Sequence, residues 1–490
     1  MNKFYVTTAI PYVNAKPHIG HALEFVQADA VARYHRLINH EVKFLTGSDE
    51  NAIKNVKAAE EAGVPVQEFI DKNAELFKQL GEKLNISFDV FQKGSSPQHH
   101  KASQKLWELC KHDIYKKEYT GKYCVGCELF YENSELNENG ECFEHPGKKL
   151  EEVSEENYFF KLSNYTEQIK KLIESDEIKI IPENRKHEVL SFLKQGLNDI
   201  SISRSNERAK NWGVPVPGDP TQRMYVWFDA LNIYQSGIGF GSDEKEYEKW
   251  WPADVHVIGK GILRFHAIYW PAFLLSAGLK LPKTIFVHEY ITINGEKMSK
   301  SIGNVIDPVQ LIEKYGTDAL RLYFLKHVSP FSDGDFSEEK FKEAYNSDLA
   351  NGLGNLVARV AKLCENNDIN IRAISKTEAG VQNKIIFWLP EPGLEKKYIE
   401  QVENFKFNEV LNIVWQQITN LDKKIAEFKP WDNENKSKEE IEKFLADDAV
   451  LSIRDIAKLL EPFLPETAEK IEEIFKGPKV KASAPLFPRI

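Results

Sequence analysis

The sequence is poor in sulfur and has no apolar run long enough to cross a membrane. Its 490 residues include only five cysteines and three methionines. The cysteines suggest no disulfide framework, so we expect a reducing compartment, the cytoplasm. The most apolar stretch, residues 268–281, contains Pro271 and is too short for a transmembrane helix. No basic and apolar leader precedes the first expected strand, and we predict no membrane contact.

Positive charge is also scarce. The chain has 64 lysines and arginines against 74 aspartates and glutamates, a net charge of −10. DNA is therefore not an expected partner, and an RNA would have to be recognised along a local basic track. The content of 42% hydrophobic and 28% charged residues is that of an ordinary soluble protein with two to four domains.

A short histidine motif follows the first expected strand. Residues 4–10 form a β-branched, apolar run typical of a buried parallel strand, and residues 19–38 carry apolar side chains at helical spacing. The loop between them leads into His18, Gly20 and His21. A helix that begins there directs free N–H groups at a bound anion, and histidine can donate to phosphate oxygens. We predict a nucleotide site, although such a motif alone is more often a plain helix start.

A second motif, KMSKS at residues 297–301, follows an expected strand at 285–293 and an Asn-Gly turn. Two lysines three positions apart on such a loop can reach a triphosphate and neutralise departing pyrophosphate. Alone, this motif would indicate only a solvated basic loop. Together, the two motifs indicate attack of a carboxylate on the α-phosphate of ATP, which is amino-acid activation.

Four candidate metal ligands lie in one short segment. Cys124 and Cys127 form one C-x2-C pair, and Cys142 and His145 form a second pair with the same spacing. Two such pairs suit a tetrahedral Zn²⁺ without an open position, the pattern of a structural site. In a small polar segment the metal replaces a hydrophobic core. The alternative is a lapsed site whose cysteines are merely buried thiols.

The order of the expected elements indicates an α/β fold with a Rossmann-like, doubly wound parallel sheet. Strands and helices alternate up to about residue 113, with one long helical stretch over 50–83. The sheet resumes with expected strands at 225–232, 256–261 and 285–293. Beyond residue 318 the periodicity becomes helical and predicts an all-α helix bundle.

We expect the following division of the chain. The two halves of the Rossmann domain are residues 1–114 and 225–295, and an inserted connective domain with the zinc knuckle occupies 115–224. A linking subdomain with the lysine motif follows at 296–345. The helical domain is 346–490 and includes a linker around 365–395.

Several long segments resemble the methionyl-tRNA synthetases, a family of class I aminoacyl-tRNA synthetases. The resemblance includes both motifs, the cysteine cluster and residues 8–36, 46–51, 225–234, 256–274, 286–308 and 430–431. It implies that methionine and ATP form methionyl-adenylate and pyrophosphate, and that the methionyl group passes to the terminal adenosine of initiator and elongator tRNA(Met). It also implies one structural zinc and Mg²⁺ with ATP. Since no dimerisation module follows the helical segment, we expect a monomer.

The resemblance also implies roles for individual residues. The catalytic groups would be His18, His21, Lys297 and Lys300, and ATP would be bound by these four with Gly20, Met298 and Ser299. The methionine pocket would comprise Ala9, Ile10, Tyr12, Asp49, Arg204, Trp227, Ala230, Leu231, Tyr234, Ile262 and His266. Asp49 matches the acidic group that holds the α-ammonium, and apolar walls suit an unbranched thioether. The anticodon would be read by Asn355, Arg359 and Trp431, the tryptophan by stacking.

Two positions depart from the family pattern. The family usually has Asp in a Gly-Lys-Asp sequence where this chain has Gly261. It usually has His-Gly after Asp-Glu, where this chain has Asn51 and Ala52. These exchanges fall where substrate positioning and ribose contacts are expected.

Two other functions stay open at this point. A class I synthetase for cysteine fits the length, although its zinc would lie inside the amino-acid pocket. A non-catalytic tRNA-binding relative would keep the fold, but the intact histidine and lysine motifs argue against it. Synthetases for isoleucine, valine and leucine carry a large editing domain between the motifs, for which this chain has little room. A small nucleotidyltransferase would lack the helical C-terminal half.

Overall fold

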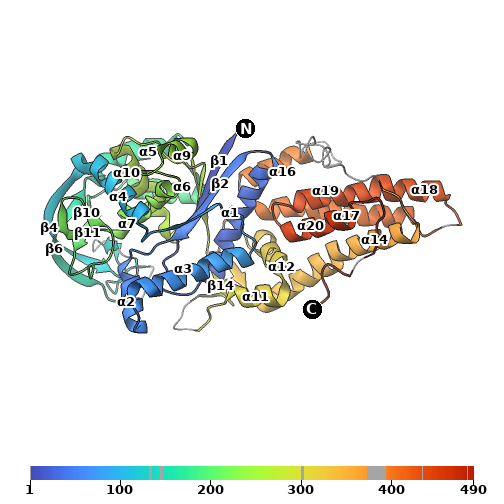
Figure 1. Ribbon diagram of the computed structural model, residues 1–490, viewed down its shortest axis with the longest axis horizontal. Coiled ribbons are helices and arrows are strands. Elements are labelled where there is room, and N and C mark those ends of the chain that lie inside the picture. The colour runs from blue at the N-terminus through green and yellow to red at the C-terminus, as the bar shows by residue number, and fades with distance from the viewer. Residues whose placement is uncertain are drawn as a thin grey trace.

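A parallel sheet lies near the middle of an elongated molecule (Figure 1). The structure is a computed structural model that describes residues 2–127, 129–131, 135–143, 147–298, 303–371, 393–432, 434–482 and 484–490. The six strands run in the order β3-β2-β1-β12-β13-β7, all pairings being parallel. They are β1 (Lys3–Thr8), β2 (Glu41–Ser48), β3 (Val90–Lys93), β7 (Lys179–Ile181), β12 (Val255–Gly259) and β13 (Thr284–His288). The predicted α/β fold is confirmed.

The sheet separates two hydrophobic cores, because successive strand residues point to opposite faces. Val6 and Phe286 face a core with α1 (Ile19–Leu37) and α3 (Val66–Lys83), and this core continues into the C-terminal helices. Tyr5 and Ile285 face the other core, with α4 (Pro97–Cys110) and α10 (Trp270–Ser276). The sheet is therefore covered on both faces, as a doubly wound fold requires.

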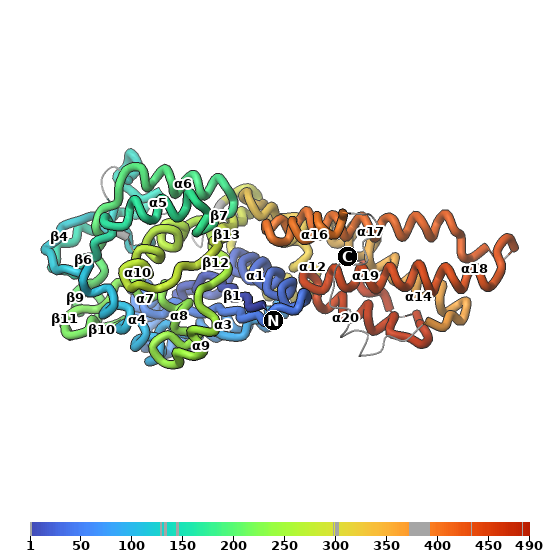
Figure 2. Tube along the Cα trace, turned by 90° about the horizontal axis from the view of Figure 1, so that it is seen from above, coloured from blue at the N-terminus to red at the C-terminus, as the bar shows by residue number. Residues whose placement is uncertain are grey.

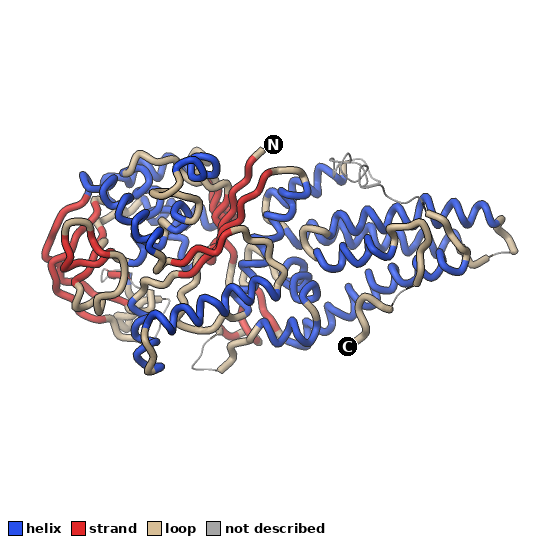
Figure 3. Tube along the Cα trace, viewed as in Figure 1, coloured by secondary structure: helices blue, strands red, loops and turns tan. Residues whose placement is uncertain are grey.

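Between the two halves of the sheet, the chain forms antiparallel sheets that lie at one end of the molecule (Figure 3). One contains β4 (Ile114–Cys124), β5 (Leu129–Tyr131), β6 (Glu151–Phe160) and β8 (Ile200–Ser201), and the other β9 (Ser203–Ser205), β10 (Pro215–Val216) and β11 (Asp219–Met224). The same stretch contains α5 (Thr166–Glu174) and α6 (Glu183–Leu193) and supplies β7, the edge strand of the parallel sheet.

Helices form the opposite end of the molecule (Figure 2). A small sheet of β14 (Ile291–Ile293), β15 (Glu296–Lys297) and β16 (Gly334–Phe336) comes first, in part of the chain that also holds α11 (Pro308–Tyr315), α12 (Thr317–Leu322) and α13 (Glu338–Ala344). The bundle has α14 (Asn355–Asn366), α16 (Leu394–Glu403), α17 (Phe407–Phe428), α18 (Lys438–Lys443), α19 (Val450–Leu460) and α20 (Pro465–Ile474). In the described residues, no helix has the length and apolar character to pass through a bilayer.

Two predicted elements were wrong. Residues 225–232 are not a strand but fold into α7 (Val226–Ala230) and lead into α8 (Ile233–Ser236). A short run that is buried all round has no period that separates strand from helix. The stretch over 50–83 is two helices, α2 (Ile53–Ala62) and α3, because Gly63 takes a left-handed φ of 68° that ends α2.

A buried ion pair joins helix α1 to the helical half of the protein. Asp29 of α1 lies 2.8 Å from Arg321 of α12, and both side chains are fully buried. The Arg321 guanidinium also donates to the backbone carbonyls of Pro462 and Phe463, and Ser87 N–H donates to Asp29. The middle of α1 is thereby tied both to the helical half and to the loop before β3.

Candidate active site

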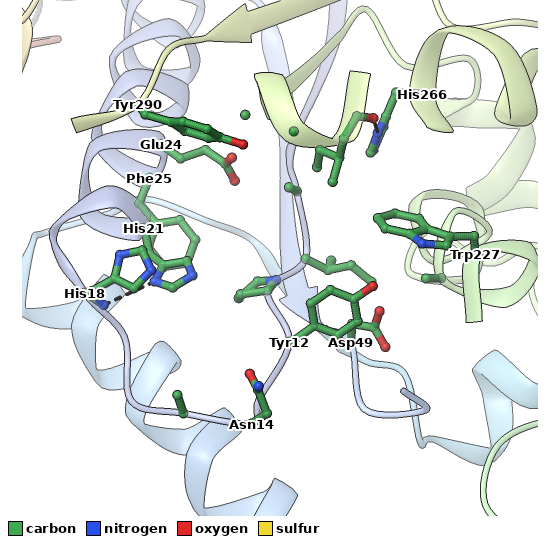
Figure 4. Close-up of a pocket in the computed structure, with 18 of the residues that line it drawn as sticks. Tyr12, Asn14, His18, His21, Glu24, Phe25, Asp49, Trp227, His266 and Tyr290 are labelled. Carbon is green, nitrogen blue, oxygen red and sulfur yellow. Dashed lines mark hydrogen bonds between the residues drawn. The ribbon is translucent and has the colours of Figure 1, made fainter. Parts of the chain in front are cut away.

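A cavity of about 440 Å³ opens at the carboxyl edge of the parallel sheet. The strand order reverses between β1 and β12, so the loops that leave these strands diverge and leave a crevice. Residues after β1, β2, β12 and β13 line the cavity together with the first turn of α1 (Figure 4). The topology alone therefore places a ligand site here.

Ten of the eleven residues predicted for the amino-acid pocket line this one cavity. They are Ala9, Ile10, Tyr12, Asp49, Trp227, Ala230, Leu231, Tyr234, Ile262 and His266. The eleventh, Arg204, lies on β9 with its guanidinium carbon 5.3 Å from the ring centre of Tyr225 and is not among the lining residues. None of the described lining residues is a cysteine, which disfavours a cysteine-specific pocket with an internal zinc.

One end of the cavity is aromatic and electrically neutral. The Trp227 ring stacks on Phe265 at a centroid distance of 3.6 Å, and Tyr12 meets Trp227 edge-on. The Tyr234 hydroxyl donates to His266 Nε2 at 2.7 Å, and His266 Nδ1–H donates to the Ile262 carbonyl at 3.0 Å. Burial lowers the pKa of His266 to about 4, so the ring is neutral at physiological pH. Such a wall suits an uncharged side chain.

The other end contains the histidine motif as the N-cap of α1. Gly20 N–H donates to His18 Nδ1, and His18 N–H donates to His21 Nδ1, both at 3.1 Å. Since each Nδ1 accepts a hydrogen bond, each neutral ring carries its proton on Nε2 and is a donor there. Burial, and next the charges of His18 and His288, hold the pKa of His21 well below its usual range. The motif thus offers two Nε2–H donors beside a helix N-terminus.

Asp49 lies between these two ends, at the carboxyl end of β2. Its side chain is buried and its backbone is fixed, because Asp49 N–H donates to the Pro11 carbonyl and the Asn55 amide donates to the Asp49 carbonyl, both at 2.9 Å. Asn51, at one of the positions that differ from the family pattern, is not among the residues that line the cavity. Its amide donates to the buried Asp229 carboxylate at 2.6 Å and to the Gly94 carbonyl, which holds the loop behind the pocket.

The lysine motif approaches the same cavity. Met298 lines it, and a Cβ placed on Gly20 would be 3.6 Å from the Met298 methyl carbon. Lys297 ends β15, and only its backbone is described. Ser299 and Lys300 lie outside the described residues, so their predicted roles stay predictions.

Further lining residues were missed by the sequence analysis. Glu24 and Tyr290 line the cavity (Figure 4), and so does Val305. Glu24 follows His21 by three positions, so helical spacing puts both on one face of α1 and could have indicated it. Tyr290 follows β13 directly, and strand ends are where ligand contacts gather in this fold.

Three cysteines form a cluster that could hold a metal. The sulfur of Cys142 lies 3.3 Å from that of Cys124 and 3.7 Å from that of Cys127. A tetrahedral zinc with bonds of about 2.3 Å separates its sulfur ligands by about 3.8 Å, so the thiols are close to the required arrangement. His145 lies outside the described residues. The Trp227 indole N–H donates to the Cys127 carbonyl at 3.4 Å, which links the cluster to the pocket wall.

The residues predicted to read an anticodon lie in the helical half of the molecule. Asn355 and Arg359 are on α14, one turn apart, and the Arg359 guanidinium carbon lies 5.3 Å from the ring centre of Trp431. Arg359 also pairs with Asp422 at 2.7 Å. Trp431 is 51% exposed. A large aromatic ring is costly to expose to water, and the exposed ring is available for stacking.

Comparison with known proteins identifies the family. Residues 4–361 match the family model described as tRNA synthetases class I (M). The methionine–tRNA ligase of Thermotoga maritima is 40% identical over 475 residues, covering 96% of this chain and 74% of that protein. The chain belongs to the methionyl-tRNA synthetase family.

Other relatives agree with this assignment. The methionine–tRNA ligase of Brucella melitensis is 39% identical over 98% of this chain and 93% of its own length. Among solved structures, the Mycobacterium tuberculosis methionyl-tRNA synthetase in complex with methionyl-adenylate superposes with a TM-score of 0.90 at 37% identity, covering 100% of both chains. The ligand-free structure of that synthetase gives a TM-score of 0.82. The resemblance noted from the sequence is confirmed.

Proposed function

We propose that the cavity is where methionine is activated, and that its residues carry the roles predicted from the sequence. The chain uses ATP to form methionyl-adenylate and then charges tRNA with methionine. The observation that carries the proposal is the convergence of Asp49, an aromatic neutral pocket and the donors of His18 and His21 in one cavity. Methionine's thioether lies against Trp227 and Tyr12, and Asp49 holds its α-ammonium group.

In the first step the methionine carboxylate attacks the α-phosphorus of ATP. An O–P bond forms while the bond to the β-phosphate breaks, and pyrophosphate leaves. His18 and His21 donate through Nε2–H to phosphate oxygens as charge builds up, and Lys297 and Lys300 neutralise the pyrophosphate. ATP enters with Mg²⁺. In the second step a hydroxyl of the terminal adenosine of tRNA attacks the methionyl carbonyl and AMP leaves.

The remaining assignments complete the proposal. Residues 1–114 and 225–295 carry catalysis, 115–224 the connective part, 296–345 the lysine motif and 346–490 anticodon recognition by Asn355, Arg359 and Trp431. Cys124, Cys127, Cys142 and His145 would hold one structural zinc. We propose that the protein is cytoplasmic, because its five cysteines, all of which the structure describes, form no disulfide. We also propose that it is a monomer.

Charging of tRNA transcripts tests this proposal. The protein should attach methionine to initiator and elongator tRNA(Met), and changing the first anticodon base from C to U should lower charging strongly. Equal charging of the transcripts with C and with U at the first anticodon position would contradict the anticodon assignment. No charging of any transcript would contradict the function itself.

A further inference from the structure

A buried hydrogen bond behind the cavity joins two of the elements that form the methionine pocket. Asn51, in the loop after β2, donates through its side-chain amide to the Asp229 carboxylate of α7 at 2.6 Å. The two residues are only 8% and 1% exposed. Asp49 precedes Asn51 by two positions, Trp227 precedes Asp229 by two positions, and both line the cavity (Figure 4). The bond therefore links the residue proposed to hold the α-ammonium group to a wall of the side-chain pocket.

The Asp229 carboxylate depends on this bond. In the part of the chain that the structure describes, the Asn51 amide is the one group that donates a hydrogen bond to it, and its second oxygen, Oδ1, is buried without a partner. Nε2 of the buried His99 lies 3.6 Å from Oδ2, beyond hydrogen-bond distance. A buried charge is costly unless it is hydrogen-bonded. Without a donor at position 51, we expect α7 to shift until Asp229 finds another donor.

The loop end of the link is held firmly. The Asn51 amide also donates to the Gly94 carbonyl at 2.8 Å, and the Gly94 N–H donates to the Ser48 carbonyl at 3.0 Å. The Glu50 carboxylate accepts from the Ser48 hydroxyl at 2.8 Å and from the N–H of Ser95 at 3.0 Å. Helix α7, by contrast, has only five residues. Asn51 thus transmits the position of the loop to α7.

Position 51 requires a hydrogen-bond donor rather than one particular residue. The family usually has histidine there, and an imidazole N–H can also donate to a carboxylate. The amide of Asn51 has two N–H groups, and it uses them on Asp229 and on the Gly94 carbonyl. The exchange in this chain therefore keeps the donor and adds a second contact.

We propose that Asn51 is a positioning residue for methionine, which sets the separation between Asp49 and Trp227 through its bond to Asp229. This inference rests on the proposed function, because it assumes methionine between Asp49 and Trp227. An amino acid that is held at its ammonium group and at its side chain is measured by that separation. Asn51 touches no substrate in this arrangement, and yet it determines the affinity for methionine and the length of side chain that fits.

Reversing the polarity of the pair tests the proposal by ATP–pyrophosphate exchange. Asn51→Asp removes both donors and places a second carboxylate against Asp229. It should raise the KM for methionine roughly tenfold or more, the value of one hydrogen bond to a charged group, with the KM for ATP unchanged. Its preference for methionine over ethionine, which is one methylene longer, should fall as well.

The double variant identifies the partner. Asp229→Asn keeps a carbonyl oxygen that can accept from Asn51, so alone it should raise the KM for methionine less than about threefold. Combined with Asn51→Asp, it supplies an amide that donates to the new carboxylate and should recover most of the loss. The contact with the Gly94 carbonyl is absent from both Asn51→Asp and the double variant, so their comparison isolates the pair.

Asn157→Asp is the matched control. The buried Asn157 amide donates to the Glu155 carboxylate at 3.0 Å on β6, and neither residue lines the cavity. The control also brings two carboxylates together, and it should lower the free energy of unfolding in urea without changing the KM for methionine. If Asn51→Asp does not fold, Asn51→Ala removes the donors without adding a charge and should show the same selective rise.

Three results would overturn the role of Asn51. They are an unchanged KM for methionine in the folded Asn51 variant, an equal rise in the KM for ATP, and a double variant no better than Asn51→Asp. No methionine-dependent exchange in the unaltered protein would instead contradict the proposed function, so the two failures are distinguishable.

Discussion

Replacing His21 by alanine separates the proposed catalytic role of this residue from its structural role. The change removes the Nε2–H donor and half of the capping box that begins α1. Loss of a helix cap costs about 0.5–2 kcal/mol of stability. Loss of a preorganised donor to transition-state charge costs about 2.7–4 kcal/mol, or roughly 100- to 1000-fold in kcat. We therefore expect a large fall in adenylate formation and a small fall in the free energy of unfolding.

ATP–pyrophosphate exchange and urea unfolding of the same preparation measure the two effects. His187→Ala, which alters an exposed histidine on α6, is the control and should change neither. A loss of kcat below fivefold in His21→Ala, with the capping cost present, would refute the donor role.

The pH dependence tests the protonation state of the same residue. The pKa of His21 lies well below 6.5, mainly through burial, so the neutral donor is fully populated from pH 6 to 8. Adenylate formation should not decline as pH rises through this range. A tenfold fall per pH unit above 6.5 would mean that an imidazolium is required, and the tautomer assignment would be wrong.

Three further predictions concern other parts of the molecule. Asp29→Asn removes the carboxylate that pairs with the buried charge of Arg321 and should lower the free energy of unfolding by about 3–5 kcal/mol in a denaturant titration. The control Glu313→Gln alters an exposed ion pair and should lower it by less than about 1 kcal/mol. Cys127→Ala should abolish zinc binding in metal analysis, and full metal content would contradict the ligand set. It should also raise the KM for methionine, because loss of the metal loosens the loop whose residue-127 carbonyl accepts from the Trp227 indole. Trp431→Ala should weaken tRNA binding by about 1–3 kcal/mol in a filter-binding titration while exchange stays normal, and equal loss of both would refute the stacking role.

Some of the fold and site could be predicted because their signals are local. Helix α1 shows its periodicity and its cap within about twenty residues, and the pairs around Cys124 and Cys142 show their spacing directly. Strand β7 is different, since its three residues carry no period and its place at the sheet edge depends on pairing with β13, about a hundred positions away. Strand pairing at that distance is set by tertiary packing.

The same limit applies inside the site. The exchange at Asn51 could be seen in the sequence, but its consequence could not, because its partner Asp229 is 178 positions away. Likewise, a Cβ on Gly261 would collide with the Tyr290 side chain, a contact that exists only once β12 and β13 lie side by side. The motifs therefore indicated the reaction, whereas the shape of the cavity wall depends on packing between segments that are far apart in the sequence.

The most direct test of the central claim is ATP–pyrophosphate exchange run separately with methionine, leucine, isoleucine, valine and cysteine. We predict strong exchange with methionine and weak exchange with the others. Some exchange with the others is expected, because an apolar pocket discriminates by only about 1–3 kcal/mol per methylene. Strongest exchange with another amino acid would contradict the pocket assignment, and no exchange with any of the five would contradict activation in this cavity.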